Sequence, residues 1–223
     1  LGEDPKDVHL VGGLGIDNIL KLPLLDQNAL ELELDFQFRE FNYLVTFHPV
    51  TLESQSGSDQ ITELLRAFSE LDNTGIIFTM PNSDTGGRHI TDLIKHFCDN
   101  HNYASSFISL GQLKYLSCLK YVDAVIGNSS SGLLEAPTFK TATINIGDRQ
   151  KGRIMASSVV NCAPEYRSIL NAIDHTKSPS FKETLQSTFN PYGSGGSADK
   201  IVKVLEDYMI PTNLQKKFYS YPA

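Results

Sequence analysis

Short apolar runs alternate with longer amphipathic segments along most of the chain. Runs of this length, bounded by glycine, proline or polar residues, predict buried β-strands. They cover residues 8–11, 41–47, 75–80, 103–109, 123–126, 142–146 and 159–162. Between them, apolar residues recur at helical spacing, as at Ile61, Leu64, Leu65 and Phe68. This alternation predicts an α/β fold, a Rossmann-like doubly wound sheet of about six mostly parallel strands with helices on both faces.

Polar residues follow several of these apolar runs directly. His48, Asn82, Ser109, Ser129 and Arg149 each come just after a predicted strand. In an open parallel sheet the carboxyl ends of the strands share one edge, and the ligand crevice lies outside that edge. We therefore expect these side chains to line one crevice.

Two neighbouring strand ends carry residues that suit an anion. The serines 129–131 are N-cap formers ahead of Glu135, and Arg149, Lys151 and Arg153 follow the run 142–146. A helix N-terminus offers unpaired N–H groups and a favourable dipole, so the pattern predicts a site for phosphate and ribose. Serine runs also cap helices that bind nothing, and a basic cluster can be a solvated turn.

A glycine-rich run, Asn190 to Ser197, precedes a helical pattern over residues 198–208. No Gly-Lys-Ser/Thr follows its glycines, so it is not a Walker phosphate loop. The simplest interpretation is a turn in which Ser197 caps the following helix.

Composition narrows the class of protein. With a net charge of −7, the chain is not expected to bind nucleic acid or an anionic membrane. No apolar run reaches the ~18–20 residues that a membrane span needs. Cys98, Cys118 and Cys162 have no metal-ligand spacing and predict buried free thiols in the cytoplasm, and we expect no metal and no cofactor.

The most specific sequence feature lies within residues 127–153, which read GNSSSGLLEAP and then TINIGDRQKGR. These segments resemble the hydrolysing UDP-N-acetylglucosamine 2-epimerases of sialic acid biosynthesis. Non-hydrolysing relatives read closer to DSGG-x-x-EE at the first segment, so the serine run favours the hydrolysing branch.

The resemblance implies a domain organisation. In this family two Rossmann-like domains close over a UDP-sugar, as in glycosyltransferases of the B type, and the chain is similar to the second domain over nearly its whole length. The opening Leu1-Gly2-Glu3-Asp4-Pro5 looks like part of a loop. We therefore expect residues 1–223 to be one C-terminal UDP-binding domain, a fragment whose N-terminal domain is absent.

The resemblance also implies roles for individual residues. A strand-terminal His-Pro in the family carries an active-site histidine, which matches His48. The family's matching glutamate, here Glu135, accepts hydrogen bonds from the ribose hydroxyls. The residues expected to bind UDP are Asn82, Ser109, Leu110, Ser129, Ser130, Glu135 and Arg149, with Asp84, Ser131 and Arg153 as weaker candidates.

The implied reaction is elimination of UDP across C1–C2 to a glycal, followed by addition of water to give N-acetylmannosamine. Family members remove the C2 proton largely with carboxylates of the first domain, so this half is expected to stabilise the leaving group. The expected partners are the UDP-sugar, the N-terminal domain and further copies of the chain.

Three other functions remain open from the sequence. A hydrolysing epimerase of a UDP-diacetamido sugar of the bacillosamine type would look alike. A glycosyltransferase donor domain would share the glutamate contact but not the run NIGDRQKGR. The third is a non-catalytic nucleotide-binding module, which a product assay would separate from an enzyme.

Overall fold

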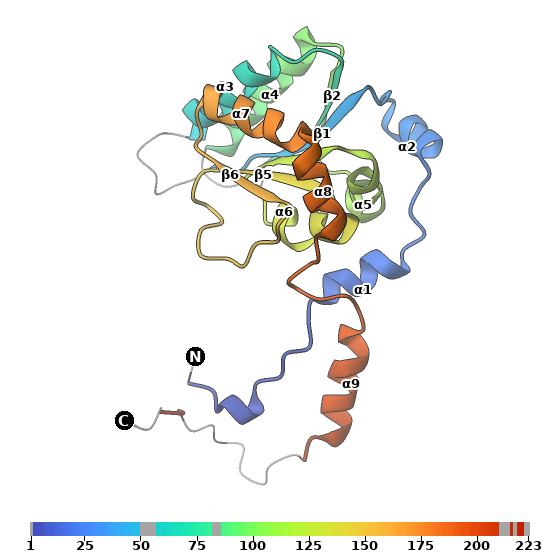
Figure 1. The fold of residues 1–223 in the computed structure, drawn as a ribbon, viewed down its shortest axis with the longest axis vertical. Coiled ribbons are helices and arrows are strands. Elements are labelled where there is room, and N and C mark those ends of the chain that lie inside the picture. Colours follow the sequence, from blue (N-terminus) through green and yellow to red (C-terminus); the bar gives the residue numbers. More distant parts are fainter. Residues whose placement is uncertain (1, 50–56, 82–85, 210–214, 216–217, 221–223) are drawn as a thin grey trace. The chain divides into compact units, whose positions relative to one another are not determined.

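The computed structural model describes residues 2–49, 57–81, 86–209, 215 and 218–220 of the 223 residues. The chain forms two compact units (Figure 1). The larger unit is Leu22–Pro191, and the smaller one combines Leu1–Lys21 with Tyr192–Ala223.

The larger unit is built on one six-stranded sheet in the order β3-β2-β1-β4-β5-β6. The strands are β1 (Phe41–Thr46), β2 (Thr74–Thr79), β3 (Ala104–Phe107), β4 (Ala124–Gly127), β5 (Ala142–Ile146) and β6 (Val159–Cys162). Every neighbouring pair is parallel. The predicted doubly wound Rossmann-like sheet is therefore confirmed.

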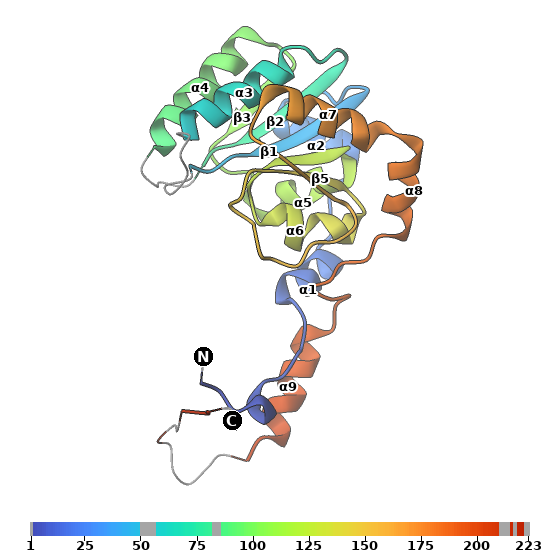
Figure 2. The ribbon, with the colours of Figure 1, turned by 60° about the vertical axis from the view of Figure 1, so that its left-hand side comes forward.

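Helices cover both faces of this sheet (Figures 1 and 2). On one face α3 (Gly57–Phe68) packs against α4 (Gly87–Asn100) and α7 (Tyr166–Lys177). On the other lie α5 (Gly111–Tyr121), with α2 (Gln27–Leu34) packed against it, and α6 (Ser131–Leu134). The short helices η2 (Ala136–Phe139) and α8 (Pro179–Ser187) complete this unit.

The core lies where the apolar runs predicted it. All six residues of β2 are buried, and β5 is buried along its whole length. On α3, Ile61, Leu64 and Phe68 are fully buried against the sheet. Strands covered by helices on both faces read as continuous apolar runs, which explains why their positions could be predicted.

The smaller unit contains η1 (Pro5–Asp7), α1 (Leu14–Lys21) and α9 (Ser197–Asp207). The strand predicted over residues 8–11 is wrong, because this segment pairs with no strand among the described residues. Val8 and Leu10 are 62% and 99% exposed. An apolar run forms a strand only where a neighbouring strand accepts its hydrogen bonds.

A carboxylate from α1 caps α9. Asp17 accepts hydrogen bonds from the N–H groups of Ser197, at 3.1 Å, and Ala198, at 2.7 Å. The predicted cap by the Ser197 side chain is therefore wrong, since the N-cap residue is Gly196 and Asp17 supplies the acceptor. These backbone hydrogen bonds, that of Ala198 first, lower the pKa of Asp17.

We predict that this cap weakens in acid. A carboxylate whose pKa is lowered by folding stabilises the folded state above its unfolded pKa, about 3.9, and loses that effect as the pH falls through the folded value. Hydrogen-exchange protection of the Ser197 and Ala198 amides, corrected for intrinsic rates, should fall with pH in this window. In Asp17→Asn, protection that still falls with pH to the same extent would contradict the assignment.

Candidate functional site

The sheet order creates a crevice between β1 and β4. All carboxyl ends lie at one edge, and the order of strands reverses at this pair. At such a switch point the chain leaves the two strands towards opposite faces of the sheet, which opens a ligand crevice. His48 follows β1 here and Ser129 follows β4.

Gly127 allows β1 and β4 to approach closely at this edge. Its φ is +134°, and a Cβ atom there would meet the carbonyl oxygen of Thr46 at 2.1 Å. Any other residue would push the two strand ends apart, because the obstacle is backbone. The glycine that ends the apolar run is thus required by the sheet itself.

A buried amide clamps the two strand ends together. The side chain of Asn128, fully buried, accepts from the His48 N–H at 2.7 Å and donates to the His48 carbonyl at 2.9 Å. One carboxamide therefore satisfies both backbone groups of His48 across the switch point. Asn128 was not among the residues predicted from the sequence, because its partner His48 is 80 residues away along the chain.

The backbone carbonyl of Asn128 also holds the loop after β5. It accepts from Arg149 Nη1 at 3.0 Å and from Gln150 Nε2 at 2.7 Å. Gln150 is 1% exposed, whereas Arg149 is exposed and can offer its other guanidinium donors to a ligand. Asn128 thus joins the ends of β1, β4 and β5, and Arg149 lies beside the serine run.

A cleft of about 440 Å³ opens beside this clamp. Of the residues predicted from the sequence, it brings together Ser109, Leu110, Ser129, Ser131 and Glu135. The remaining lining residues are Thr46, Thr79, Met80, Ile108, Gly111, Gln112, Tyr115 and Leu116. Tyr115 and Gln112 were not predicted, because their position on α5 carries no motif.

Hydrogen bonds inside the cleft link three side chains. The Tyr115 hydroxyl donates to Ser131 Oγ at 2.6 Å, and Ser131 Oγ donates to Glu135 Oε2. Burial raises the pKa of Tyr115, so this hydroxyl keeps its proton at neutral pH. Ser129 Oγ accepts from the Ser131 N–H at 3.4 Å.

The helix predicted after the serines is a single turn. α6 has only four residues, η2 follows it with a proline in its first turn, and Ser130 makes no side-chain capping bond. A helix of one turn has a small dipole, so the expected dipole contribution to anion binding is largely lost. Within the described part of the chain, the N–H groups of Ser129 and Ser130 still have no hydrogen-bond acceptor. They remain suitable donors for an anion.

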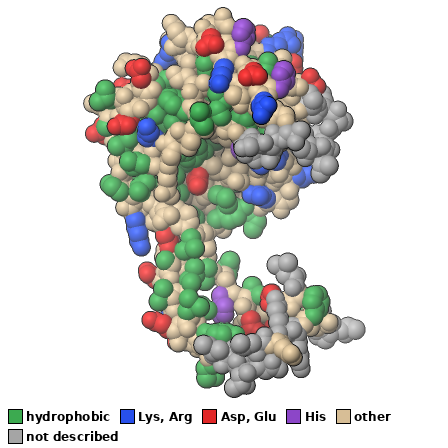
Figure 3. Space-filling view, turned by 180° about the vertical axis from the view of Figure 1, so that it is seen from behind, with side chains coloured by type: hydrophobic (Ala, Val, Ile, Leu, Met, Phe, Trp, Pro, Cys, Tyr) green, Lys and Arg blue, Asp and Glu red, His purple; other side chains and the backbone are tan. Residues whose placement is uncertain are grey.

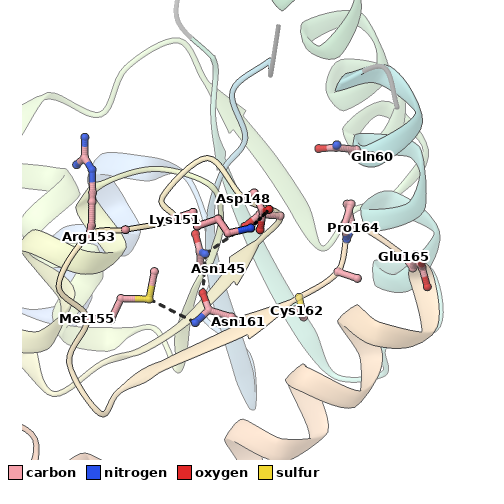
Figure 4. A pocket seen from close by; sticks show the side chains of 13 residues that line it. Gln60, Asn145, Asp148, Lys151, Arg153, Met155, Asn161, Cys162, Pro164 and Glu165 are labelled. Atoms are coloured by element: carbon pink, nitrogen blue, oxygen red, sulfur yellow. Dashed lines mark hydrogen bonds and ion pairs between the residues drawn. The ribbon is translucent and has the colours of Figure 1, made fainter. Parts of the chain in front are cut away.

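Arg153 does not line the cleft that contains Glu135. It lines a second pocket of about 790 Å³ at the ends of β5 and β6, together with the exposed ion pair of Lys151 and Asp148 at 2.7 Å (Figure 4). Asn145, 2% exposed, donates to Asn161 Oδ1 at 2.7 Å in the same pocket. The two arginines of the basic cluster therefore face different surroundings.

Two predicted site residues, Asn82 and Asp84, lie outside the described residues. Among the described residues, no group of three or more His, Cys, Asp or Glu side chains is placed to hold a metal ion. The described helices include none that is long and apolar enough to cross a membrane.

The three cysteines are free thiols, and burial raises the pKa of Cys118 and of Cys162 to about 12.

The fold and the site define the class of protein. A doubly wound parallel sheet with a polar crevice at its switch point is the architecture of nucleotide-binding α/β proteins. The family model described as UDP-N-acetylglucosamine 2-epimerase matches residues 1–206, and the chain belongs to this family.

Individual relatives agree with this assignment. The chain is 40% identical over 224 residues to polysialic acid biosynthesis protein P7 of Escherichia coli, covering 100% of the chain and 57% of that protein. It is 37% identical over 220 residues to the hydrolysing GDP/UDP-N,N'-diacetylbacillosamine 2-epimerase of Campylobacter jejuni, covering 98% and 57%. The chain thus spans little more than half the length of these relatives.

A solved structure shares the fold. The UDP-GlcNAc 2-epimerase of Methanocaldococcus jannaschii in complex with UDP-GlcNAc and UDP has a TM-score of 0.69 and 16% sequence identity. The match covers 92% of the chain and 56% of that structure. At this identity the similarity concerns the fold alone.

We predict that Asn128→Ala destabilises the larger unit by about 2–6 kcal/mol, because two His48 backbone groups would lose their partner at roughly 1–3 kcal/mol each. Urea unfolding measures the change. The control is Asn102→Ala, which removes an exposed contact to Arg39 and should stay within about 0.5 kcal/mol. Equal stability of the two variants would contradict the clamp.

Proposed function

We propose that the chain is the UDP-binding half of a hydrolysing UDP-N-acetylglucosamine 2-epimerase. The enzyme would eliminate UDP to leave a glycal and add water to release N-acetylmannosamine. The observation that carries the proposal is the cleft in which Ser109, Leu110, Ser129 and Glu135 lie together, next to Arg149.

Each part of UDP has a counterpart in this cleft. The backbone at Ser109 and Leu110 meets the uracil, and Glu135 accepts from the ribose hydroxyls. The diphosphate takes the N–H groups of Ser129 and Ser130 and the remaining donors of Arg149. Negative charge grows on the diphosphate as the bond from C1 to oxygen breaks, and fixed donors act most strongly where charge develops.

His48 and Asn82 complete the proposed site. The clamp by Asn128 fixes the backbone of His48 at the switch point, where the diphosphate would lie. Asn82 comes shortly after β2 in the sequence, and we keep it as a candidate for binding the nucleotide on the strength of the family resemblance. We keep Asp84 as a weaker candidate, and we assign Arg153 to the second pocket and not to the diphosphate.

Removal of the C2 proton is assigned to another part of the whole protein. Glu135 is engaged by Ser131 and by the ribose, and Asp148 is paired with Lys151 in the second pocket.

Apolar side chains gather on the surface of the smaller unit (Figure 3). Leu14, Val202, Leu205 and Met209 are 54%, 52%, 68% and 89% exposed, which supports packing against an N-terminal domain. We place the enzyme in the cytoplasm as a homo-oligomer.

A hydrolysing epimerase of a UDP-diacetamido sugar is the second candidate, because the relative from Campylobacter jejuni is 37% identical. The two candidates share UDP and differ in the sugar. Assaying the intact enzyme with both UDP-sugars separates them, since the preferred substrate gives the higher kcat/KM.

We predict that Glu135→Ala weakens UDP binding about 10- to 150-fold, since a hydrogen bond to a charged group is worth roughly 1.5–3 kcal/mol. Isothermal titration calorimetry with UDP and with uridine measures it. Wild-type protein should bind UDP more tightly than uridine, because the diphosphate adds its own contacts. The matched control is Glu183→Ala, an exposed glutamate on α8. Unchanged UDP affinity in Glu135→Ala would contradict the ribose contact.

We predict that residues 1–223 bind UDP weakly but do not turn over UDP-N-acetylglucosamine, because no base among the described residues is placed by a motif to remove the C2 proton. Proton removal requires a base within hydrogen-bond reach of that proton. Release of UDP and of N-acetylmannosamine is followed chromatographically, with the intact enzyme as a positive control. Turnover near the intact rate would place the base in this half and overturn the division of roles.

A further inference from the structure

Glu135 lies at the junction of two short helices. It ends the single turn of α6 and precedes η2, with φ −110° and ψ −49°. A glutamate side chain has several staggered rotamers, and each gives a different direction to its carboxylate oxygens. Something other than the backbone must select the rotamer that faces the cleft.

Two consecutive hydrogen bonds, from Tyr115 to Ser131 and from Ser131 to Glu135, select the rotamer of Glu135. Ser131 has one hydroxyl proton, and it donates this proton to Glu135 Oε2 while it accepts from Tyr115 at 2.6 Å. A hydroxyl offers one donor only, so Ser131 has none left for a phosphate. This argues against the expected role of Ser131 as a direct ligand of UDP.

The hydrogen bonds from Tyr115 through Ser131 leave Glu135 able to bind a diol. A carboxylate offers about four acceptor positions on its two oxygens, of which Ser131 uses one. Oε1 and the second lone pair of Oε2 remain for hydrogen bonds from adjacent hydroxyls. All three side chains line the same cleft.

We propose that Tyr115 and Ser131 are positioning residues that orient Glu135 towards the 2′- and 3′-hydroxyls of the ribose, and thereby select ribonucleotides over 2′-deoxyribonucleotides. The inference rests on the proposed function, because it assumes that a uridine nucleotide occupies the cleft. Tyr115 lies at the middle of α5, which is anchored under the cleft by the buried Leu116 and Leu119. Its hydroxyl is therefore held in place before any ligand arrives.

The test measures the ratio of two affinities on one sample. UDP and 2′-deoxy-UDP are titrated into the wild-type protein, into Tyr115→Phe and into Ser131→Ala. Wild type should prefer UDP about 10- to 150-fold, the loss expected for one hydrogen bond to a charged group. Each variant should lower this preference by about fivefold, the equivalent of roughly 1 kcal/mol for a neutral hydrogen bond.

The matched control is Tyr121→Phe, which removes another tyrosine hydroxyl from the same helix. Tyr121 donates to the Leu25 carbonyl at 3.3 Å and does not line the cleft. This variant should keep the wild-type preference. Partial unfolding reduces the amount of active protein for both ligands equally, so a purely structural effect leaves the ratio unchanged.

The outcomes distinguish a failure of the proposed function from a failure of the positioning role of Tyr115 and Ser131. If wild type binds no UDP, or binds both nucleotides equally, the assignment of Glu135 to the ribose fails and the proposed function must be revised. If wild type prefers UDP and both variants keep that preference, the proposed function stands and the positioning role of Tyr115 and Ser131 is wrong. A preference that falls in Tyr115→Phe and Ser131→Ala but not in Tyr121→Phe supports the inference.

Discussion

The carboxamide of Asn128 is the contact on which the site depends. It satisfies both backbone groups of His48, while the backbone carbonyl of Asn128 accepts from Arg149 and Gln150. Residues far apart in the sequence are held within hydrogen-bond distance of one asparagine. Because Asn128 is fully buried, breaking these contacts would leave polar groups without partners in the interior. These contacts therefore fix the ends of β1, β4 and β5 relative to one another.

This clamp divides the carboxyl edge of the sheet into two regions. On one side, the ends of β1, β2 and β4 and the start of α5 form the cleft that contains Glu135. On the other, the ends of β5 and β6 form the second pocket, which contains Arg153. Arg149 reaches back to Asn128 and belongs to the boundary between them. Fixed donors at a boundary of this kind suit the diphosphate of a nucleotide sugar, whose two ends extend in opposite directions.

Much of the fold could be predicted because its strands are buried on both faces and read as continuous apolar runs. The position of residues after those runs then predicted which side chains would share one edge. The strand predicted over residues 8–11 does not form, because an apolar pattern does not show whether a neighbouring strand is present to pair with it. No length was predicted for the helix after the serines, although Pro137, which cannot donate a backbone hydrogen bond, was a visible signal that an α-helix would not continue through it. Asn128 was missed because its role depends on the pairing of β1 with β4, which local sequence does not reveal.

The most direct measurement is a crystal structure of the protein with UDP. We expect the uracil at the Ser109–Leu110 backbone, the ribose on Glu135, and the diphosphate between Ser129 and Arg149. The clamp by Asn128 should be unchanged on binding. UDP bound in the second pocket, or in the cleft with its diphosphate directed away from the switch point, would show that the proposed UDP site is wrong.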